Sequence, residues 1–456
     1  MATNTNLGGV FTTDTDGNIT DSAFLSTENV VGIIFDTSIV GGLDKALGKD
    51  TVASKVFANG NVVELNTSKD YEDAGIDDTL MSGLVKYHLD SFFTLAGGIQ
   101  RIFVSFMNSD EDTEFEAIEK MQLASGGIIY QIGVWTAKPI ATKNADGTYV
   151  TENGNLSAKL QAVAETLGGK IGITNYEGNA PLNILVSAPV VNEATVDIKA
   201  LPDLSELNLP KVTVVLGQSP TDAVHKLMFD INHVTEDKTF APVGCIGAVM
   251  ACLAVAPANE SIAHVANFNL SAVMQEAEFG FGSIVEVEDG ETYDPASSFT
   301  NIKTLGYTKR NNYFHKKGYV FLTNYDGLEN SIFLSSDQTL STGDYRSLTR
   351  CRVMHKSRRV VRRALLPRVN ADVEIDAKTG YMSASAVAEF QNIVTEALDI
   401  NMVEPGTSRP QISGRTCYID PLQKVLLNDA VDISYSLVPK GITSTINVTE
   451  GFTSQV

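Results

Sequence analysis

The 456-residue sequence is poor in the residues that build metal, disulfide and redox sites. It has only four cysteines and six histidines. No cysteine pair has zinc or redox spacing, and no two histidines stand four positions apart as they do on a metal-binding helix. The sequence therefore predicts no metal site and no disulfide framework. The cysteines are interpreted as small buried side chains in a reducing compartment.

Motifs for nucleotide binding and covalent catalysis are also missing. A P-loop needs four residues between its first glycine and Gly-Lys-Ser/Thr. The closest segment, residues 42–50, has five, and it places Asp50 where the hydroxyl belongs. No catalytic residue and no cofactor are predicted. An α/β enzyme with an unmarked site stays open as an alternative, and it predicts a polar pocket at the carboxyl ends of strands near Gly217.

Long apolar runs and an excess of basic charge are absent as well. The longest apolar stretch is the segment between Pro242 and Pro257, which is too short to span a bilayer and is typical of a buried helix. The first residues lack the basic start and apolar run of a signal peptide. With 34 Lys and Arg against 55 Asp and Glu, the chain carries −21, which argues against general binding to nucleic acid or anionic membranes.

Strand-like and helical segments alternate through the first half of the chain, and this alternation predicts a mainly parallel, doubly wound sheet. The expected strands are 29–36, 102–106, 128–135, 183–189 and 211–217, and the expected helices are 80–98, 113–124, 156–168 and 221–231.

The second half has a different pattern, so the predicted fold class is α/β plus α+β. A strand pair is expected at 318–325 and 331–336, a helix at 383–398, and two alternating strands at 431–439 and 444–452. The predicted organisation is an N-terminal arm (1–27), an α/β domain (28–257), an irregular connector (258–317), an α+β domain (318–440) and a C-terminal arm strand (441–456).

One short segment departs from the acidic balance of the chain. Residues 345–371 hold nine basic residues and no carboxylate, so the rest of the chain carries −30. At helical spacing Arg352, Lys356, Arg359 and Arg363 fall on one line, apolar residues fall opposite, and a proline ends the helix.

This basic helix has two interpretations. It is either a solvated surface helix whose arginines pair with nearby acids, or a docking face for an acidic partner. Nucleic acid is the less favoured of the possible partners, because the acidic rest of the chain would repel phosphate and no aromatic residue stands among the arginines to stack on bases.

Two stretches resemble contractile tail sheath proteins of bacteriophages and related injection machines. In residues 88–189, a helix that ends in Gly-Gly is followed by a strand. A second helix and strand come next, and then a third helix precedes a strand that ends in Ala-Pro. The second stretch begins at the basic helix. It continues through an Asp-Pro turn at Asp420, a strand ending at Pro439, a break at Gly441 and a last alternating strand ending in Gly-Phe.

The resemblance implies a structural subunit that stacks as hexameric rings around a tail tube and contracts to drive the tube through a target envelope without nucleotide hydrolysis. The implied partners are further copies of the chain, the tail tube protein, and baseplate and terminator proteins, with no nucleic acid and no direct membrane insertion. The implied place is a virion tail or injection particle assembled in bacterial cytoplasm. Another virion shell component, such as a capsid protein, is the remaining alternative, and it predicts shells or sheets instead of tubes.

The resemblance also assigns residues. Terminal arms in that family add strands to neighbouring sheets, and the basic helix would meet an acidic tube or a neighbouring subunit. The predicted docking residues are Arg352, Lys356, Arg359 and Arg363. The residues predicted to take part in strand exchange between subunits are Ile442, Ile446, Val448 and Phe452.

Overall fold

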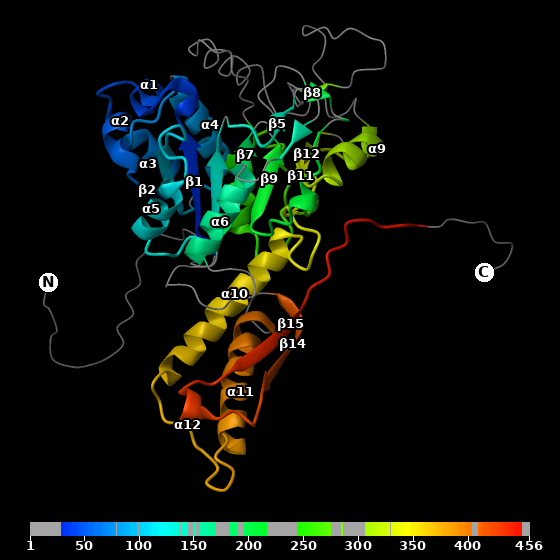
Figure 1. The fold of residues 1–456 in the computed structure, drawn as a ribbon. Helices are drawn as coiled ribbons and strands as arrows, with labels where there is room; N and C mark the ends of the chain where they lie inside the picture. Colours follow the sequence, from blue (N-terminus) through cyan, green and yellow to red (C-terminus); the bar gives the residue numbers. More distant parts are fainter. Residues whose placement is uncertain are drawn as a thin grey trace, which may run out of the picture.

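The computed structural model describes residues 29–448, except for 79, 99, 137, 145–148, 152–155, 169–181, 189–195, 198, 200, 217–243, 275–283, 286–305, 329 and 404–408. The predicted N-terminal arm and the predicted helix at 221–231 lie outside the described residues. Figure 1 shows an upper part built on a large sheet and a lower part that is connected to it by one long helix, α10 (Leu348–Leu365).

A seven-stranded sheet with the order β11-β9-β7-β4-β1-β3-β2 forms the upper part (Figure 1). Its strands are β1 (Val31–Asp36), β2 (Val63–Leu65), β3 (Ile102–Met107), β4 (Gln131–Trp135), β7 (Asn183–Ala188), β9 (Val212–Leu216) and β11 (Tyr319–Val320). All pairings are parallel except that between β2 and β3. The five strands from β9 to β3 in this order are buried along their whole length, which is why they appear as continuous apolar runs.

Two glycines show which helix covers each face of the sheet. A Cβ at Gly32 in β1 would lie 2.4 Å from the sulfur of Met121 in α5 (Glu116–Ala124). A Cβ at Gly133 in β4 would lie 2.9 Å from Ile246 in α8 (Ile246–Val255). The two glycines are one register step apart on paired strands, so they point to opposite faces. Helix α5 therefore covers one face and α8 the other.

Helix α8 is the predicted buried helix, and it is enclosed on its outer side by α4 (Leu80–Leu95). The two helices approach so closely that a Cβ at Gly247 would lie 2.1 Å from the carbonyl oxygen of His88. Glycine at this position is what permits the packing.

The remaining elements of the upper part are short except for α6. They are α1 (Leu43–Leu47), α2 (Val52–Val56), α3 (Ser68–Asp73), β5 (Thr142–Lys143), β6 (Tyr149–Val150), α6 (Leu156–Gly168), β8 (Val196–Asp197), β10 (Ile284–Val285), α9 (Gly306–Arg310), β12 (Leu322–Thr323) and β13 (Phe333–Leu334). The strand pair predicted around Asp326 exists as β12 and β13, but its first strand is divided. Residues 319–320 instead form β11 at the edge of the large sheet, because the chain crosses from one sheet to the other at Phe321.

The lower part contains α10 (Leu348–Leu365), α11 (Ala384–Leu398), β14 (Ile412–Ile419), α12 (Val425–Asn428) and β15 (Ile433–Pro439). Serine hydroxyls cap both long helices. Ser347 accepts a hydrogen bond from the amide of Arg350, and Ser383 accepts one from Ala386. Pro367 lies in the short 3-10 turn that follows α10, as the sequence predicted.

The partner of β15 differs from the prediction. Strand β15 pairs antiparallel with β14, a strand that the sequence analysis did not include, and α11 packs against this pair. The strand predicted at 444–452 is not formed over 444–448, and its remaining residues lie outside the described part of the chain.

Candidate interaction surfaces

Helix α10 lies between the two parts of the molecule (Figure 1). One side of it contributes Val353 and Val361 to the core beneath α11 and β14. On that side the hydroxyl oxygens of Ser357 and Tyr435 lie 3.2 Å apart. The other side meets the upper part, so basic residues there are enclosed by protein and not by solvent.

Arg352 closes the carboxyl end of α8. Its side chain is only 4% exposed, and Nη2 donates hydrogen bonds to the carbonyl oxygens of Ala256 and Leu253. These carbonyls have no partner within the helix, and a cation there also interacts favourably with the helix dipole. Burial lowers the pKa of Arg352 to about 10, which still leaves the guanidinium charged at neutral pH.

Further basic groups are buried where α10 passes the amino ends of β7 and β9. Lys211 donates a hydrogen bond to the carbonyl oxygen of Ala164 at 3.2 Å, and burial together with the charge of Arg358 lowers its pKa to about 8. His355 is buried beside these cations. Burial first, and then the charges of Lys211, Arg358 and Arg359, lower its pKa well below the usual 6.5. His355 is therefore neutral at physiological pH.

The four predicted docking residues do not form one exposed face. Arg352 and Lys356 are buried, and Arg359 is half-buried with its guanidinium 3.8 Å from the centre of the Tyr130 ring. Only Arg363 is exposed. The prediction of a single basic docking face was wrong, because helical spacing fixes the angles between side chains but not which side meets solvent. A tube-docking role for the residues that solvent reaches stays a prediction.

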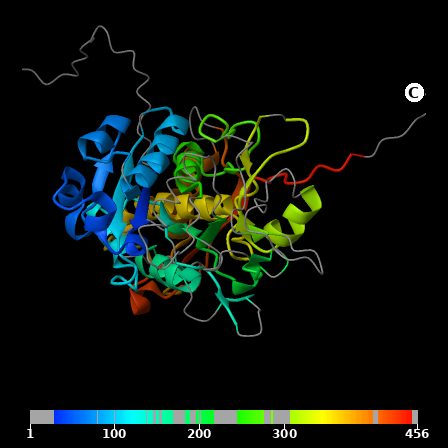
Figure 2. The same ribbon diagram turned by 90° about the horizontal axis from the view of Figure 1, so that it is seen from above.

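The C-terminal arm leaves the body of the protein after β15 (Figures 1 and 2). Residues 441–448 have no helix or strand, and Ile442, Ile446 and Val448 are 44%, 79% and 75% exposed. Phe452 lies outside the described residues. Their role in strand exchange stays a prediction, but the described arm residues have the exposure that such a role requires.

A second apolar surface was missed in the sequence. Leu422, Leu426 and Leu427, in the connection between β14 and β15, are 64%, 75% and 75% exposed. The available signal was the composition of PLQKVLLN, because a connection between two strands on a protein surface is normally polar.

The carboxyl end of the sheet was the other place where a site could be expected. Asp36 is fully buried there at the end of β1 and accepts four hydrogen bonds. The donors are the amides of Ser38 and Ser109 and the hydroxyls of Ser109 and Thr136. Asp36 therefore ties together the ends of β1, β3 and β4 and serves as a structural anchor. Gly217, where the enzyme alternative places its pocket, lies outside the described residues.

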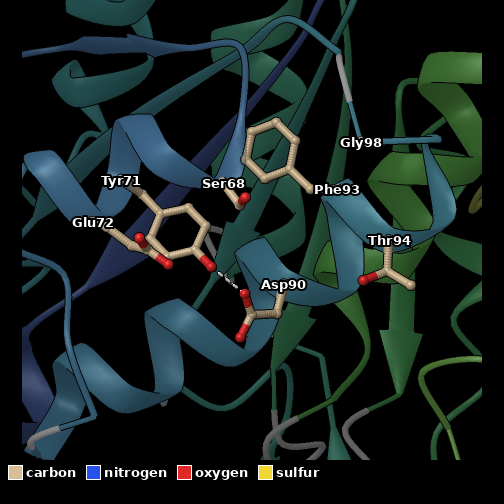
Figure 3. A pocket seen from close by; sticks show the side chains of 7 residues that line it. All are labelled: Ser68, Tyr71, Glu72, Asp90, Phe93, Thr94 and Gly98. Carbon is tan, nitrogen blue, oxygen red and sulfur yellow. Dashed lines mark hydrogen bonds between the residues drawn. The ribbon is translucent and has the colours of Figure 1, made fainter.

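A shallow hollow of about 490 Å³ opens on the surface beside α3 and α4 (Figure 3). It is lined by Ser68, Tyr71, Glu72, Asp90, Phe93, Thr94 and Gly98. The hydroxyl of Tyr71 donates to Asp90, and burial together with this carboxylate raises the pKa of Tyr71. The phenol of Tyr71 is therefore held protonated.

The described part of the chain has neither a candidate metal site nor a candidate membrane span. None of its His, Cys, Asp and Glu side chains form a group of three or more that could hold a metal ion. None of its helices combines the length and the apolar character needed to cross a bilayer.

Comparison with known proteins gives matches of two kinds. A family model described as the C-terminal domain of DUF2586 matches residues 344–456. No curated protein matches the chain.

Solved structures match over the whole length. The helical sheath of the anti-feeding prophage in its contracted state is 12% identical with a TM-score of 0.52, over 99% of this chain and 100% of that one. The contracted sheath complex of an extracellular contractile injection system, PVC, is 11% identical with a TM-score of 0.52, over 100% of this chain and 99% of that one. A chain of the six-fold symmetrised anti-feeding prophage baseplate is 11% identical with a TM-score of 0.51, over 99% and 100%. The chain thus has the fold of contractile sheath proteins, which confirms the resemblance at the level of the fold.

Proposed function

We propose that this chain is a structural subunit of a contractile sheath. The supporting observation is its likeness to two contracted sheath structures, which extends over 99–100% of both chains in each comparison. A likeness of this extent includes the long helix and the C-terminal sheet as well as the upper part. The proposed role is mechanical, with no catalytic residue, cofactor or metal.

The finer proposal is a subunit that stacks as hexameric rings around a tail tube and contracts to drive the tube through a target envelope. Its partners would be further copies of itself, the tube protein, and baseplate and terminator proteins. It would belong to a virion tail or injection particle assembled in bacterial cytoplasm. The tube-docking residue would be Arg363, which is exposed near the end of α10. Arg352 instead binds the end of α8, and Lys356 is buried.

Two features of the lower part support association through the arms. The sheet of β14 and β15 has only two strands, so each has an edge that its own chain does not pair within the described residues. The C-terminal arm has exposed apolar side chains at Ile442, Ile446 and Val448. An added strand would pair the backbone at such an edge, and the buried side chains would add to the stability of the joint.

Negative-stain microscopy of the purified protein tests this proposal. We expect hollow tubes with six-fold symmetry, formed without nucleotide or metal. A variant ending at Lys440 should keep the wild-type circular dichroism spectrum and stay monomeric, because residues 441–448 make no helix or strand of their own.

Other outcomes would favour the alternatives. Closed shells or flat sheets would indicate another virion component. A protein that stays monomeric at high concentration and turns over a small substrate would indicate an enzyme. Either result would contradict the proposed function.

A further inference from the structure

The amino ends of three neighbouring parallel strands carry polar side chains in the interior of the protein. Gln131 begins β4, Asn183 begins β7, and Lys211 directly precedes β9. Gln131 and Asn183 are register partners, and β7 pairs with β9 from the next residue onward. The three side chains, here called the amino-end row, therefore lie next to one another. They are at most 3% exposed.

One face of α10 lies against the amino-end row. The thiol of Cys351 donates a hydrogen bond to the carbonyl oxygen of Pro210 at 3.4 Å, just before Lys211. His355 and Arg358 follow Cys351 by four and seven residues, so all three are on the same side of the helix. His355 and Arg358 are 1% and 6% exposed. Polar side chains of the helix and of the strand ends thus meet where solvent does not reach.

Several polar atoms at this meeting point have no hydrogen-bond partner among the described residues. They are both ring nitrogens of His355, Nη1 of Arg358 and Oε1 of Gln131. Both amide atoms of Asn183 also lack a partner, although its side chain lies near the thiol of Cys351. Buried polar groups in native proteins almost always bind another protein group, a water molecule or an ion. So many such atoms between one helix and one row of strand ends indicate a bound species.

The charge of the meeting point is positive, which favours an anion over water alone as the bound species. The charges that act on His355 are those of Lys211, Arg358 and Arg359. Glu165, on α6, is the carboxylate that acts on Lys211. The three cations outnumber this carboxylate. Excess positive charge in a buried site is costly unless a negative group compensates it.

Arg358 lacks an acidic partner of its own. Its guanidinium interacts with the hydroxyl of Tyr345, which is a neutral group. Within the described part of the chain, no carboxylate forms an ion pair with it. Asp337, near the start of α10, instead accepts hydrogen bonds from Thr349 and acts on Arg352. A buried guanidinium normally binds a negative group, so Arg358 is the residue best placed to hold an anion.

We propose that a small monovalent anion of the size of chloride binds between α10 and the amino-end row. Nη1 of Arg358 and a ring N–H of His355 donate hydrogen bonds to it, the amide of Asn183 contributes a further donor, and the ammonium of Lys211 adds its charge. These few donors suit a monatomic anion better than phosphate, whose several oxygens need more donors. The anion fastens α10, and with it the lower part, to the large sheet.

Thermal unfolding of the full chain at constant ionic strength tests the site. Sodium gluconate, whose anion is too large to be buried here, is replaced stepwise by sodium chloride. We expect the melting temperature to rise by several degrees, linearly with the logarithm of the chloride concentration above the dissociation constant, because only the folded state binds the anion. The emission of Trp135, which is fully buried in β4, reports the unfolding.

Two variants on α10 show where the anion binds. Arg358→Gln removes the buried guanidinium and should lose the chloride-dependent rise in melting temperature. Arg363→Gln makes the same change at an exposed position of the same helix and should keep the rise. Circular dichroism at low temperature checks that both variants are folded.

Chlorine-35 NMR detects binding to the wild-type protein, so the test does not depend on the folding of Arg358→Gln. Exchange of chloride between solvent and an ordered site broadens its resonance. We expect broadening that bromide reverses by competition and that protein unfolded in urea does not produce.

Two results would overturn the proposal. Equal melting temperatures in gluconate and chloride, with no broadening that bromide reverses, would mean that water alone occupies the site. A chloride effect of the same size in wild type and in folded Arg358→Gln would mean that the anion binds elsewhere on the protein. Neither result affects the proposed sheath function, because unfolding and NMR do not require assembly.

Discussion

Removal of the Arg352 guanidinium tests whether α10 is anchored to the upper part as the structure describes. In Arg352→Ala, the carbonyls of Leu253 and Ala256 at the end of α8 lose their charged donor in a site without solvent. Hydrogen bonds to a charged group contribute about 1.5–3 kcal/mol. The Ala256 carbonyl keeps the hydrogen bond from the side-chain amide of Asn29, so only the Leu253 carbonyl loses a donor that the described residues do not replace.

The cost of burying the charge works in the opposite direction. A pKa lowered from 12.5 to about 10 corresponds to roughly 3 kcal/mol that the native state spends on desolvation. Removing the charge recovers part of that cost, so we expect Arg352→Ala to destabilise the protein by about 3 kcal/mol rather than by the full sum of its contacts. Arg352→Met keeps more of the volume and should cost less than the alanine variant.

The single tryptophan gives a suitable assay. Trp135 is fully buried at the carboxyl end of β4, so its emission reports the unfolding of the upper part. With a urea m-value of about 3 kcal/mol/M, a loss of about 3 kcal/mol lowers the unfolding midpoint by about 1 M.

The matched control is on the same helix. Arg363→Ala removes the same side chain from an exposed position and should change the free energy of unfolding by less than about 0.5 kcal/mol. Equal small shifts for the two alanine variants would refute the reasoning, because they would mean that Arg352 is also on the surface.

Two further predictions concern buried groups. The pKa of His355 lies well below 6.5, so below about pH 6.5 the unfolded chain binds a proton that the folded chain does not, and stability falls by up to about 1.4 kcal/mol per pH unit. His355→Leu should therefore make the melting temperature fall less steeply between pH 6.5 and 5, and an unchanged slope would contradict this. Gly247→Ala should lower the melting temperature strongly or prevent folding, because its Cβ would meet the backbone of His88, whereas Gly343→Ala has its nearest contact at 3.7 Å and should be neutral.

The sheet and the long helices could be predicted because their signals are local. The strands from β9 to β3 are buried on both faces and are therefore continuous apolar runs, and Ser383 marks the start of α11 with a capping hydroxyl. Strand β14 was missed because Gly414, Arg415 and Thr416 interrupt any apolar alternation. The segment forms a strand because it pairs with β15, and this pairing cannot be seen in its composition.

The buried cations of α10 could not be placed from the sequence. An arginine at helical spacing normally indicates solvent, but Arg352 is stabilised by carbonyls of a helix end about a hundred residues earlier in the chain. Only the packing of α10 against α8 reveals these acceptors. The exposed leucines of α12 were missed for a similar reason, because the sequence does not show that Val425 packs inward while Leu426 and Leu427 are exposed.

The exposed large apolar side chains are concentrated in the C-terminal region of the described chain. Of the 17 large apolar residues that are exposed among the described residues, nine lie between Ile400 and Val448. Soluble monomers rarely concentrate apolar surface in this way, whereas surfaces that bind other proteins do. The part of this region before the arm is packed against α10: β15 pairs with β14, β14 packs on α11, and α11 packs on α10. Because Arg352 fixes α10 to α8, a displacement of the C-terminal surfaces by a neighbouring molecule would be transmitted to the large sheet and would not be absorbed between the two parts.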